Sequence, residues 1–171
     1  MTAALLALIA VRFFPSNLFN PPSAQAFSII SPIPDNLNID IHPPTQITIP
    51  SLDIKLPIAQ AQISGNSWTL YNDKVSWLTT SKLPGFGNVI LYAHNRRHLF
   101  GPLKNIEVGE QIIVEQEGKN YTYLVSEKRK VLPDNVEAIL SSRDQLTLYT
   151  CDGSFDQRRL VVIALPQENN L

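Results

Sequence analysis

Short strand-like runs separated by glycine and proline turns occupy most of the chain after residue 45. Apolar and polar residues alternate in residues 45–49 and 52–56, and residues 89–93 form an unbroken apolar run. A period of two is typical of a half-buried strand, whereas a short apolar run bounded by turn residues is typical of a fully buried one. The sequence therefore predicts a fold that is mainly β.

The second half of the chain continues this pattern. Residues 111–116 and 121–125 flank a glycine turn and predict a β-hairpin. Two closing strands are expected at 146–151 and 160–164. Many short strands with little helix favour a closed or nearly closed β-barrel, because closure leaves no strand edge unpaired.

One short helix is expected over residues 136–140. Asp134 can cap its first turn, and Glu137 follows three positions later, as in a capping box. The expected fold class is thus a mainly β barrel with one or two short helices.

Length and composition agree with a single domain. The chain has 171 residues and 44% hydrophobic content, enough for one core. Its formal net charge is −1, whereas a nucleic-acid-binding domain normally carries a basic surface. We therefore expect no nucleic-acid partner.

The first 45 residues differ from the rest of the chain. An uninterrupted apolar run at 3–11 is followed by Arg12 and Pro15, whereas a membrane-spanning helix needs about 20 apolar residues. We interpret residues 1–14 as a shortened membrane anchor. A cleaved secretory signal and a soluble amphipathic arm are alternatives that the sequence leaves open.

Proline dominates residues 15–45. These prolines are Pro15, Pro21, Pro22, Pro32, Pro34, Pro43 and Pro44. Proline fixes φ and removes a backbone donor, so this segment is expected to be an extended linker, or stalk. A disordered tail without a role is the alternative. The folded domain is then expected to span residues 46–168.

Cys151 is the only cysteine of the chain and ends a strand-like run, and His94 directly follows the run at 89–93. Arg158 and Arg159 precede the last strand-like run. A free thiol has a pKa of about 8.5 and needs a positive neighbour to act as a thiolate. Imidazole can move protons, and a guanidinium can stabilise an oxyanion. These groups are the parts of a cysteine acyl-transfer site.

Taken singly, each residue also has an ordinary structural explanation. A lone cysteine at a strand end is often a small buried hydrophobe, and His94 alone is more often a surface or capping residue. A noncatalytic β-barrel, displayed on the stalk as a binding module, is therefore the alternative function. Its thiol would have ordinary reactivity.

Four stretches of the sequence resemble one known family, in the family's order. They are residues 83–94, residues 100–110, the segment Thr147-Leu-Tyr-Thr-Cys151, and residues 159–162. The third resembles the Thr-Leu-x-Thr-Cys signature of the sortases, cysteine transpeptidases of the bacterial cell surface. The first resembles the run that leads to the catalytic histidine, and the last resembles the strand that opens with the catalytic arginine.

The resemblance implies an eight-stranded, sortase-type β-barrel with Cys151 as nucleophile, His94 as acid and base, and Arg159 as stabiliser of substrate and oxyanion. It implies cleavage of a C-terminal sorting signal such as Leu-Pro-x-Thr-Gly in secreted proteins, through a thioester. The acyl group would pass to an amine of a peptidoglycan precursor or a pilin. Sortases are anchored at the outer face of the cytoplasmic membrane by the N-terminus, which fits residues 1–14.

We predict no cofactor and no metal. The acidic loop residues that calcium-dependent sortases use cannot be matched here residue by residue. We also expect a monomer. A different cysteine transpeptidase, acting on the cross-linking peptides of the cell wall, is disfavoured because those enzymes resemble a Ser-x-Gly-Cys context, which Leu148-Tyr-Thr-Cys151 lacks.

The choice between neighbouring residues follows from strand geometry. Arg159 is preferred to Arg158 because it stands directly before Leu-Val-Val, as the family's arginine does, and because adjacent strand residues face opposite sides. His98 lies beyond the strand and is expected to be solvated. Thr150 is a candidate for substrate contact beside the nucleophile.

Leu99 and Phe100 are candidates for an apolar groove that would receive the leucine and proline of the substrate. Packing of both side chains in the core is the equal alternative.

Overall fold

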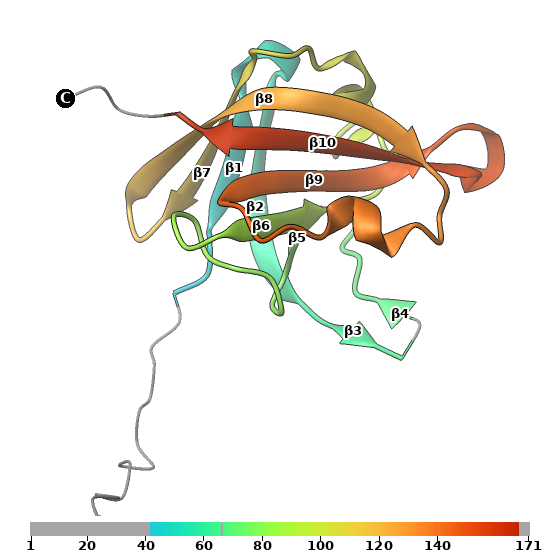
Figure 1. Ribbon diagram of the computed structural model, residues 1–171, viewed down its shortest axis with the longest axis horizontal. Helices are drawn as coiled ribbons and strands as arrows, with labels where there is room; N and C mark the ends of the chain where they lie inside the picture. Colours follow the sequence, from blue (N-terminus) through green and yellow to red (C-terminus); the bar gives the residue numbers. More distant parts are fainter. Residues whose placement is uncertain (1–41, 66, 168–171) are drawn as a thin grey trace, which may run out of the picture. The chain divides into compact units, whose positions relative to one another are not determined.

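Eight strands close into a barrel in a computed structural model that describes residues 42–65 and 67–167. The predicted anchor at 1–14 and nearly all of the linker lie outside the described residues. The strand order is β1-β2-β5-β6-β9-β10-β8-β7, and β7 pairs with β1 to complete the circle (Figure 1). The prediction of a closed, eight-stranded, mainly β barrel is therefore confirmed.

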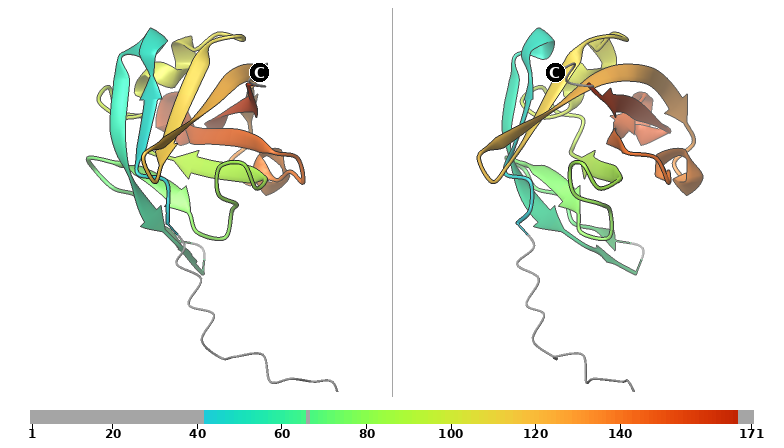
Figure 2. Two further views of the ribbon diagram at one scale, coloured as in Figure 1. Left: turned by 90° about the vertical axis from the view of Figure 1, so that its left-hand side faces the viewer. Right: turned by 60° about the vertical axis from the view of Figure 1, so that its left-hand side comes forward.

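The barrel strands are β1 (Gln46–Ile49), β2 (Ile54–Ala61), β5 (Val75–Leu78), β6 (Asn88–Tyr92), β7 (Gln111–Gln116), β8 (Lys119–Val131), β9 (Gln145–Asp152) and β10 (Arg158–Pro166). Two pairs, β2 with β5 and β6 with β9, are parallel, and the other neighbours are antiparallel. A small separate hairpin, β3 (Ile63–Ser64) and β4 (Ser67–Trp68), is inserted between β2 and β5. It projects beyond the barrel in both views of Figure 2.

The predicted hairpin around residues 117–120 is formed by β7 and β8. Glu117 and Gly118 make the turn, and both have positive φ, 52° and 72°. Two successive positive φ angles are what a tight two-residue hairpin turn requires. Strand β8 is longer than predicted because it continues past the hairpin to pair with β10.

The helices of the described residues are short 3-10 helices: η1 (Pro50–Leu52), η2 (Gly101–Asn105), η3 (Val136–Ile139) and η4 (Ser154–Asp156). The predicted helix at 136–140 corresponds to η3, but its expected cap is wrong. Asn135, not Asp134, is the N-cap, and its side chain accepts a hydrogen bond from the Ala138 amide at 3.2 Å. None of the helices in the described part of the chain is long and apolar enough to cross a membrane.

Strands β6, β9 and β10 are buried on both faces. Their alternate residues Leu91, Leu148 and Leu160 belong to the core inside the barrel, to which strands all around the barrel contribute. The residues between them, such as Tyr92 and Val161, join a second apolar cluster on the outer face.

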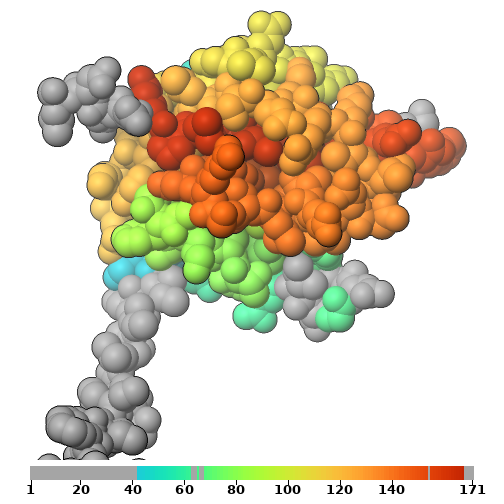
Figure 3. Space-filling view, viewed as in Figure 1, coloured from blue at the N-terminus to red at the C-terminus, as the bar shows by residue number. Residues whose placement is uncertain are grey.

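The second cluster is covered by Ala138 and Ile139 of η3 and by Trp68 of β4. In the space-filling view the connection between β8 and β9 lies over this part of the barrel (Figure 3). Burial on both faces explains why β6 and β10 contain unbroken apolar runs in the sequence.

Candidate active site

Three neighbouring strands bring the predicted residues to one place. β9 lies between β6 and β10, and Cys151 on β9 is paired in register with Arg159 on β10. On the other side Tyr149 is paired with Tyr92 of β6, two residues before His94. Paired residues of adjacent strands point to the same face of a sheet. Cys151, Arg159 and His94 therefore meet on the outer face of the barrel.

Thr150 connects the end of β6, which leads to His94, with β9, which carries the thiol. Its hydroxyl donates a hydrogen bond to the Ala93 carbonyl at 2.8 Å, and the Ala93 amide donates to the Tyr149 carbonyl at 3.3 Å. Thr150 itself is only 2% exposed. The residues just before His94 and just before Cys151 are thus held together by a buried bond.

A tightly folded loop follows His94. The His94 carbonyl accepts hydrogen bonds from the amides of Arg96 at 2.9 Å and Phe100 at 3.2 Å. The Gly101 amide donates to the Arg96 carbonyl at 2.9 Å, and a Cβ on Gly101 would stand 2.7 Å from that same oxygen. Leu99 and Phe100 are fully buried in the barrel core and anchor the loop.

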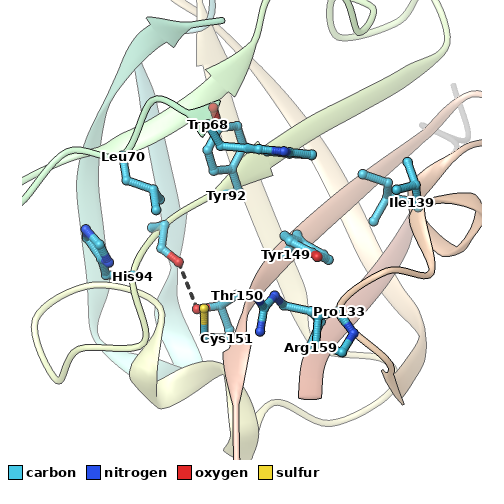
Figure 4. Close-up of a pocket in the computed structure, with 12 residues that line it drawn as sticks. Trp68, Leu70, Tyr92, His94, Pro133, Ile139, Tyr149, Thr150, Cys151 and Arg159 are labelled. Carbon is cyan, nitrogen blue, oxygen red and sulfur yellow. Dashed lines mark hydrogen bonds between the residues drawn. The ribbon is translucent and has the colours of Figure 1, made fainter. Parts of the chain in front are cut away.

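A cavity of about 420 Å³ opens beside the thiol. Its lining residues are Trp68, Leu70, Tyr92, Ala93, His94, Pro133, Val136, Ile139, Tyr149, Thr150, Cys151 and Arg159. In Figure 4, Cys151 lies between His94 on one side and Arg159 on the other. The half-buried thiol is therefore open to a ligand in the cavity.

Burial raises the pKa of the Cys151 thiol. The positive charge of Arg159 acts in the opposite direction, and the negative charge of Asp156 raises the pKa further. Burial also lowers the pKa of His94, as does the charge of Arg96, while Asp156 opposes them. Both shifts favour an uncharged thiol beside an uncharged imidazole in the free protein.

The two adjacent arginines have different surroundings. The Arg159 guanidinium donates to the Asp156 carbonyl at 2.6 Å and to the Arg158 carbonyl at 3.0 Å, and it lines the cavity. Arg158 is exposed and is paired with Asp152 in the strand register. Asp152 forms an ion pair with Lys130 at 2.8 Å. These positions support Arg159 as the arginine of the site.

Cys151, His94, Arg159 and Thr150 are thus brought to one cavity, whereas Leu99 and Phe100 are not. These two pack inside the barrel and do not line the cavity, so core packing, the alternative, describes them. His98 does not line the cavity either. Its ring is hydrogen-bonded to the Asn72 carbonyl at 3.0 Å.

Sequence reasoning missed the aromatic part of the cavity. Tyr92 and Tyr149 each stand two residues before a predicted site residue, and strand alternation places residues two apart on one face. That spacing was a usable signal for both tyrosines. Trp68 had no comparable signal, since it reaches the cavity from the separate β3–β4 hairpin.

No group of three or more histidine, cysteine or acidic side chains that could hold a metal ion is found among the described residues.

Comparison with known proteins identifies the family. The sortase domain model matches residues 47–167. Among solved structures, sortase C1 from Streptococcus agalactiae is similar with a TM-score of 0.64 and 30% identity, over 74% of this chain and 68% of that one. Sortase C from Clostridium perfringens gives a TM-score of 0.62 and 27% identity, over 76% and 74% of the two chains. The chain belongs to the sortase family.

Curated relatives agree. Sortase A from Streptococcus agalactiae is 29% identical over 131 residues, which cover 69% of this chain and 50% of that protein. A putative sortase from Bacillus subtilis is 35% identical over 83 residues, 46% of this chain and 81% of that protein. The chain spans about half the length of the sortase A proteins it matches.

Proposed function

We propose that this protein is a cysteine transpeptidase that cleaves a peptide sorting signal and transfers the acyl fragment to an amine. The observation that carries the proposal is the meeting of Cys151, His94 and Arg159 at one cavity from three neighbouring strands. Each supplies a different function of acyl transfer, namely nucleophile, proton carrier and positive charge.

In the acylation step the Cys151 sulfur attacks the carbonyl carbon of the scissile peptide bond as a thiolate, with His94 holding the proton. Arg159 stabilises the negative charge on the carbonyl oxygen. When the C–N bond breaks, the imidazolium gives its proton to the leaving amine, and a thioester on Cys151 results.

The second step runs in the reverse sense. An acceptor amine attacks the thioester carbonyl, the His94 imidazole takes a proton from that amine, and the sulfur leaves as the thiolate. A new amide bond forms and the free enzyme is restored. When an amine rather than water attacks the thioester, the acyl group is transferred to that amine, and the enzyme acts as a transferase.

For the substrate we propose a Leu-Pro-x-Thr-Gly-like signal of secreted proteins, and for the acceptor an amine of a peptidoglycan precursor or a pilin. The apolar walls of the cavity, formed by residues such as Pro133, Val136 and Ile139, suit an apolar peptide segment. The apolar start at 1–14 and the proline-rich linker support attachment to the outer face of the cytoplasmic membrane.

The proposal is tested by incubating the protein with Leu-Pro-x-Thr-Gly-type peptides and a set of amine acceptors. The expected products are the acyl fragment joined to the amine and the released C-terminal fragment. A matched reaction with Cys151→Ala should form neither product. Equal product formation by that variant would contradict the proposed nucleophile.

A further inference from the structure

The loop that follows His94 is contacted by a residue from a different segment of the chain. Asn72 lies in the connection between β4 and β5, outside the barrel strands. Its side-chain carbonyl accepts a hydrogen bond from the Arg96 guanidinium at 2.8 Å. Its backbone carbonyl accepts one from Nε2 of His98 at 3.0 Å. One residue thus holds the loop at two points, through two different groups.

The segment that carries Asn72 is itself attached to the barrel. The Tyr71 hydroxyl donates to the Gln60 carbonyl of β2 at 2.7 Å. The fully buried Ser76 hydroxyl of β5 donates to the Thr69 carbonyl at 2.9 Å. Asn72 therefore stands on a support that is bonded to two barrel strands.

Arg96 is the central residue of the loop. Its amide donates to the His94 carbonyl at 2.9 Å, the pattern of a γ-turn. Its carbonyl accepts hydrogen bonds from the amides of Leu99 and Gly101, both at 2.9 Å. The Arg96 backbone is thus fixed close to His94. Within residues 42–65 and 67–167 its guanidinium has one hydrogen-bond partner, the side chain of Asn72.

The charge on this guanidinium acts on the imidazole. Burial lowers the pKa of His94, the charge of Arg96 lowers it further, and the charge of Asp156 opposes both. Beside the imidazole, β9 contributes Cys151 and β10 contributes Arg159 (Figure 4), and the tyrosines of the cavity are uncharged at neutral pH.

An exposed arginine without a partner samples many rotamers in water, where its charge is screened. Both Arg96 and Asn72 are exposed. The effect of Arg96 on the imidazole therefore depends on what holds its guanidinium in place.

We propose that Asn72 is a positioning residue that acts on His94 through Arg96, holding the guanidinium where its charge keeps the imidazole unprotonated. The inference rests on the proposed transpeptidase function, in which an unprotonated imidazole receives the proton of the thiol. Asn72 itself contacts neither the thiol nor the cavity lining. The proton carrier of the site is thus adjusted by a segment outside the barrel strands.

NMR titration of the His94 ring protons tests the proposal without any substrate. The His94 signals are identified by their absence in His94→Ala. Asn72→Ala should raise the pKa of His94, because the Arg96 charge is no longer held in place, and Arg96→Gln should raise it because the charge is gone. The double variant should equal Arg96→Gln alone, since Asn72 acts through Arg96.

Two features make the comparison specific. Asn72→Ala keeps the backbone carbonyl that His98 contacts, so the loop stays attached at that point. Arg97→Gln removes the charge of the adjacent, exposed arginine, and its smaller effect should simply add to that of Asn72→Ala. An unchanged or lowered His94 pKa in Asn72→Ala overturns the proposal, as do additive effects of Asn72→Ala and Arg96→Gln.

The pH dependence of kcat/KM for peptide acylation gives the functional result. Its acid limb reports the pKa of His94 in the free protein and should move to higher pH in Asn72→Ala. A lower rate with an unmoved acid limb would indicate a merely structural role and overturns the proposal. Absence of acylation in the wild type is instead a failure of the proposed function, and the NMR titration then still decides the role of Asn72.

Discussion

The fraction of the protein with Cys151 as a thiolate and His94 as an imidazolium at a given pH depends on the pKa values of these two groups. Burial raises the pKa of the thiol and lowers the pKa of the imidazole. Both shifts disfavour the charged thiolate and imidazolium in the free protein. Arg159 favours the thiolate and Asp156 disfavours it, so these two residues set the reactivity of the sulfur in opposite senses.

Alkylation of Cys151 tests this balance. Arg159→Ala removes the charge that lowers the thiol pKa, so the midpoint of the rate of alkylation against pH should move to higher pH. Asp156→Asn removes a charge that raises the pKa and should move the midpoint to lower pH. Rates with iodoacetamide across neutral and alkaline pH measure both shifts.

Arg158→Ala is the matched control, because Arg158 is exposed and outside the cavity lining. Its midpoint should equal that of the wild type. Equal midpoints in the Arg158 and Arg159 variants would contradict the choice of Arg159. A noncatalytic binding module, in turn, predicts a thiol of ordinary reactivity.

His94→Ala should slow acylation by about a hundredfold to ten thousandfold, since the variant has no group to protonate the leaving amine. The rate of thioester formation with a sorting peptide is the measurement. His98→Ala should be close to wild type, because that ring contacts Asn72 and lies outside the cavity lining. A larger loss in the His98 variant would reverse the assignment of the two histidines.

At the scale of elements, the parallel pair β6 and β9 positions the site. The buried bond from Thr150 to the Ala93 carbonyl joins the two strands at the point where the chain leaves β6 for His94. Loss of this bond leaves a buried carbonyl without its partner, which is costly.

Thr150→Val keeps the shape of the side chain and removes the hydroxyl. We expect the free energy of unfolding to fall by about 1–3 kcal/mol, measured by urea denaturation. Thr150→Ser keeps the donor and should lose less. If the valine variant were as stable as the wild type, the bond would have no role in holding the two strand ends together.

Most elements near the site could be predicted from the sequence because both faces of their strands are buried. Strands β6 and β10 contain unbroken apolar runs, β9 alternates leucine with threonine over 146–148, and the turn at Gly118 marks the β7–β8 hairpin. Strand β5 was missed because four buried residues give too short a pattern. The place of Trp68 at the cavity depends on its contacts with Tyr92 and Tyr149, which no local pattern encodes.

At the scale of the whole molecule, most of the core inside the barrel lies apart from the site on its outer face. Ile47 of β1 is fully buried in the interior cluster and does not line the cavity. The stability of the barrel and the chemistry of the cavity should therefore respond to different substitutions.

Ile47→Ala should lower the free energy of unfolding by about 2–5 kcal/mol, the cost of a large-to-small change in a packed core. Its acylation rate should remain near that of the wild type at temperatures where the variant is folded. Urea denaturation and peptide acylation of the same preparation measure the two quantities. A rate that falls in the fully folded variant would show that core and site are coupled.

The role of Cys151 as nucleophile is tested most directly by the mass of the protein after brief incubation with a Leu-Pro-Ala-Thr-Gly peptide in the absence of an amine acceptor. We expect an added mass equal to the acyl fragment, located on the peptide that contains Cys151 and removed by hydroxylamine. Cys151→Ala should show no such addition. An acyl fragment attached elsewhere, or retained in the Cys151→Ala variant, would contradict the assignment of Cys151 as the nucleophile.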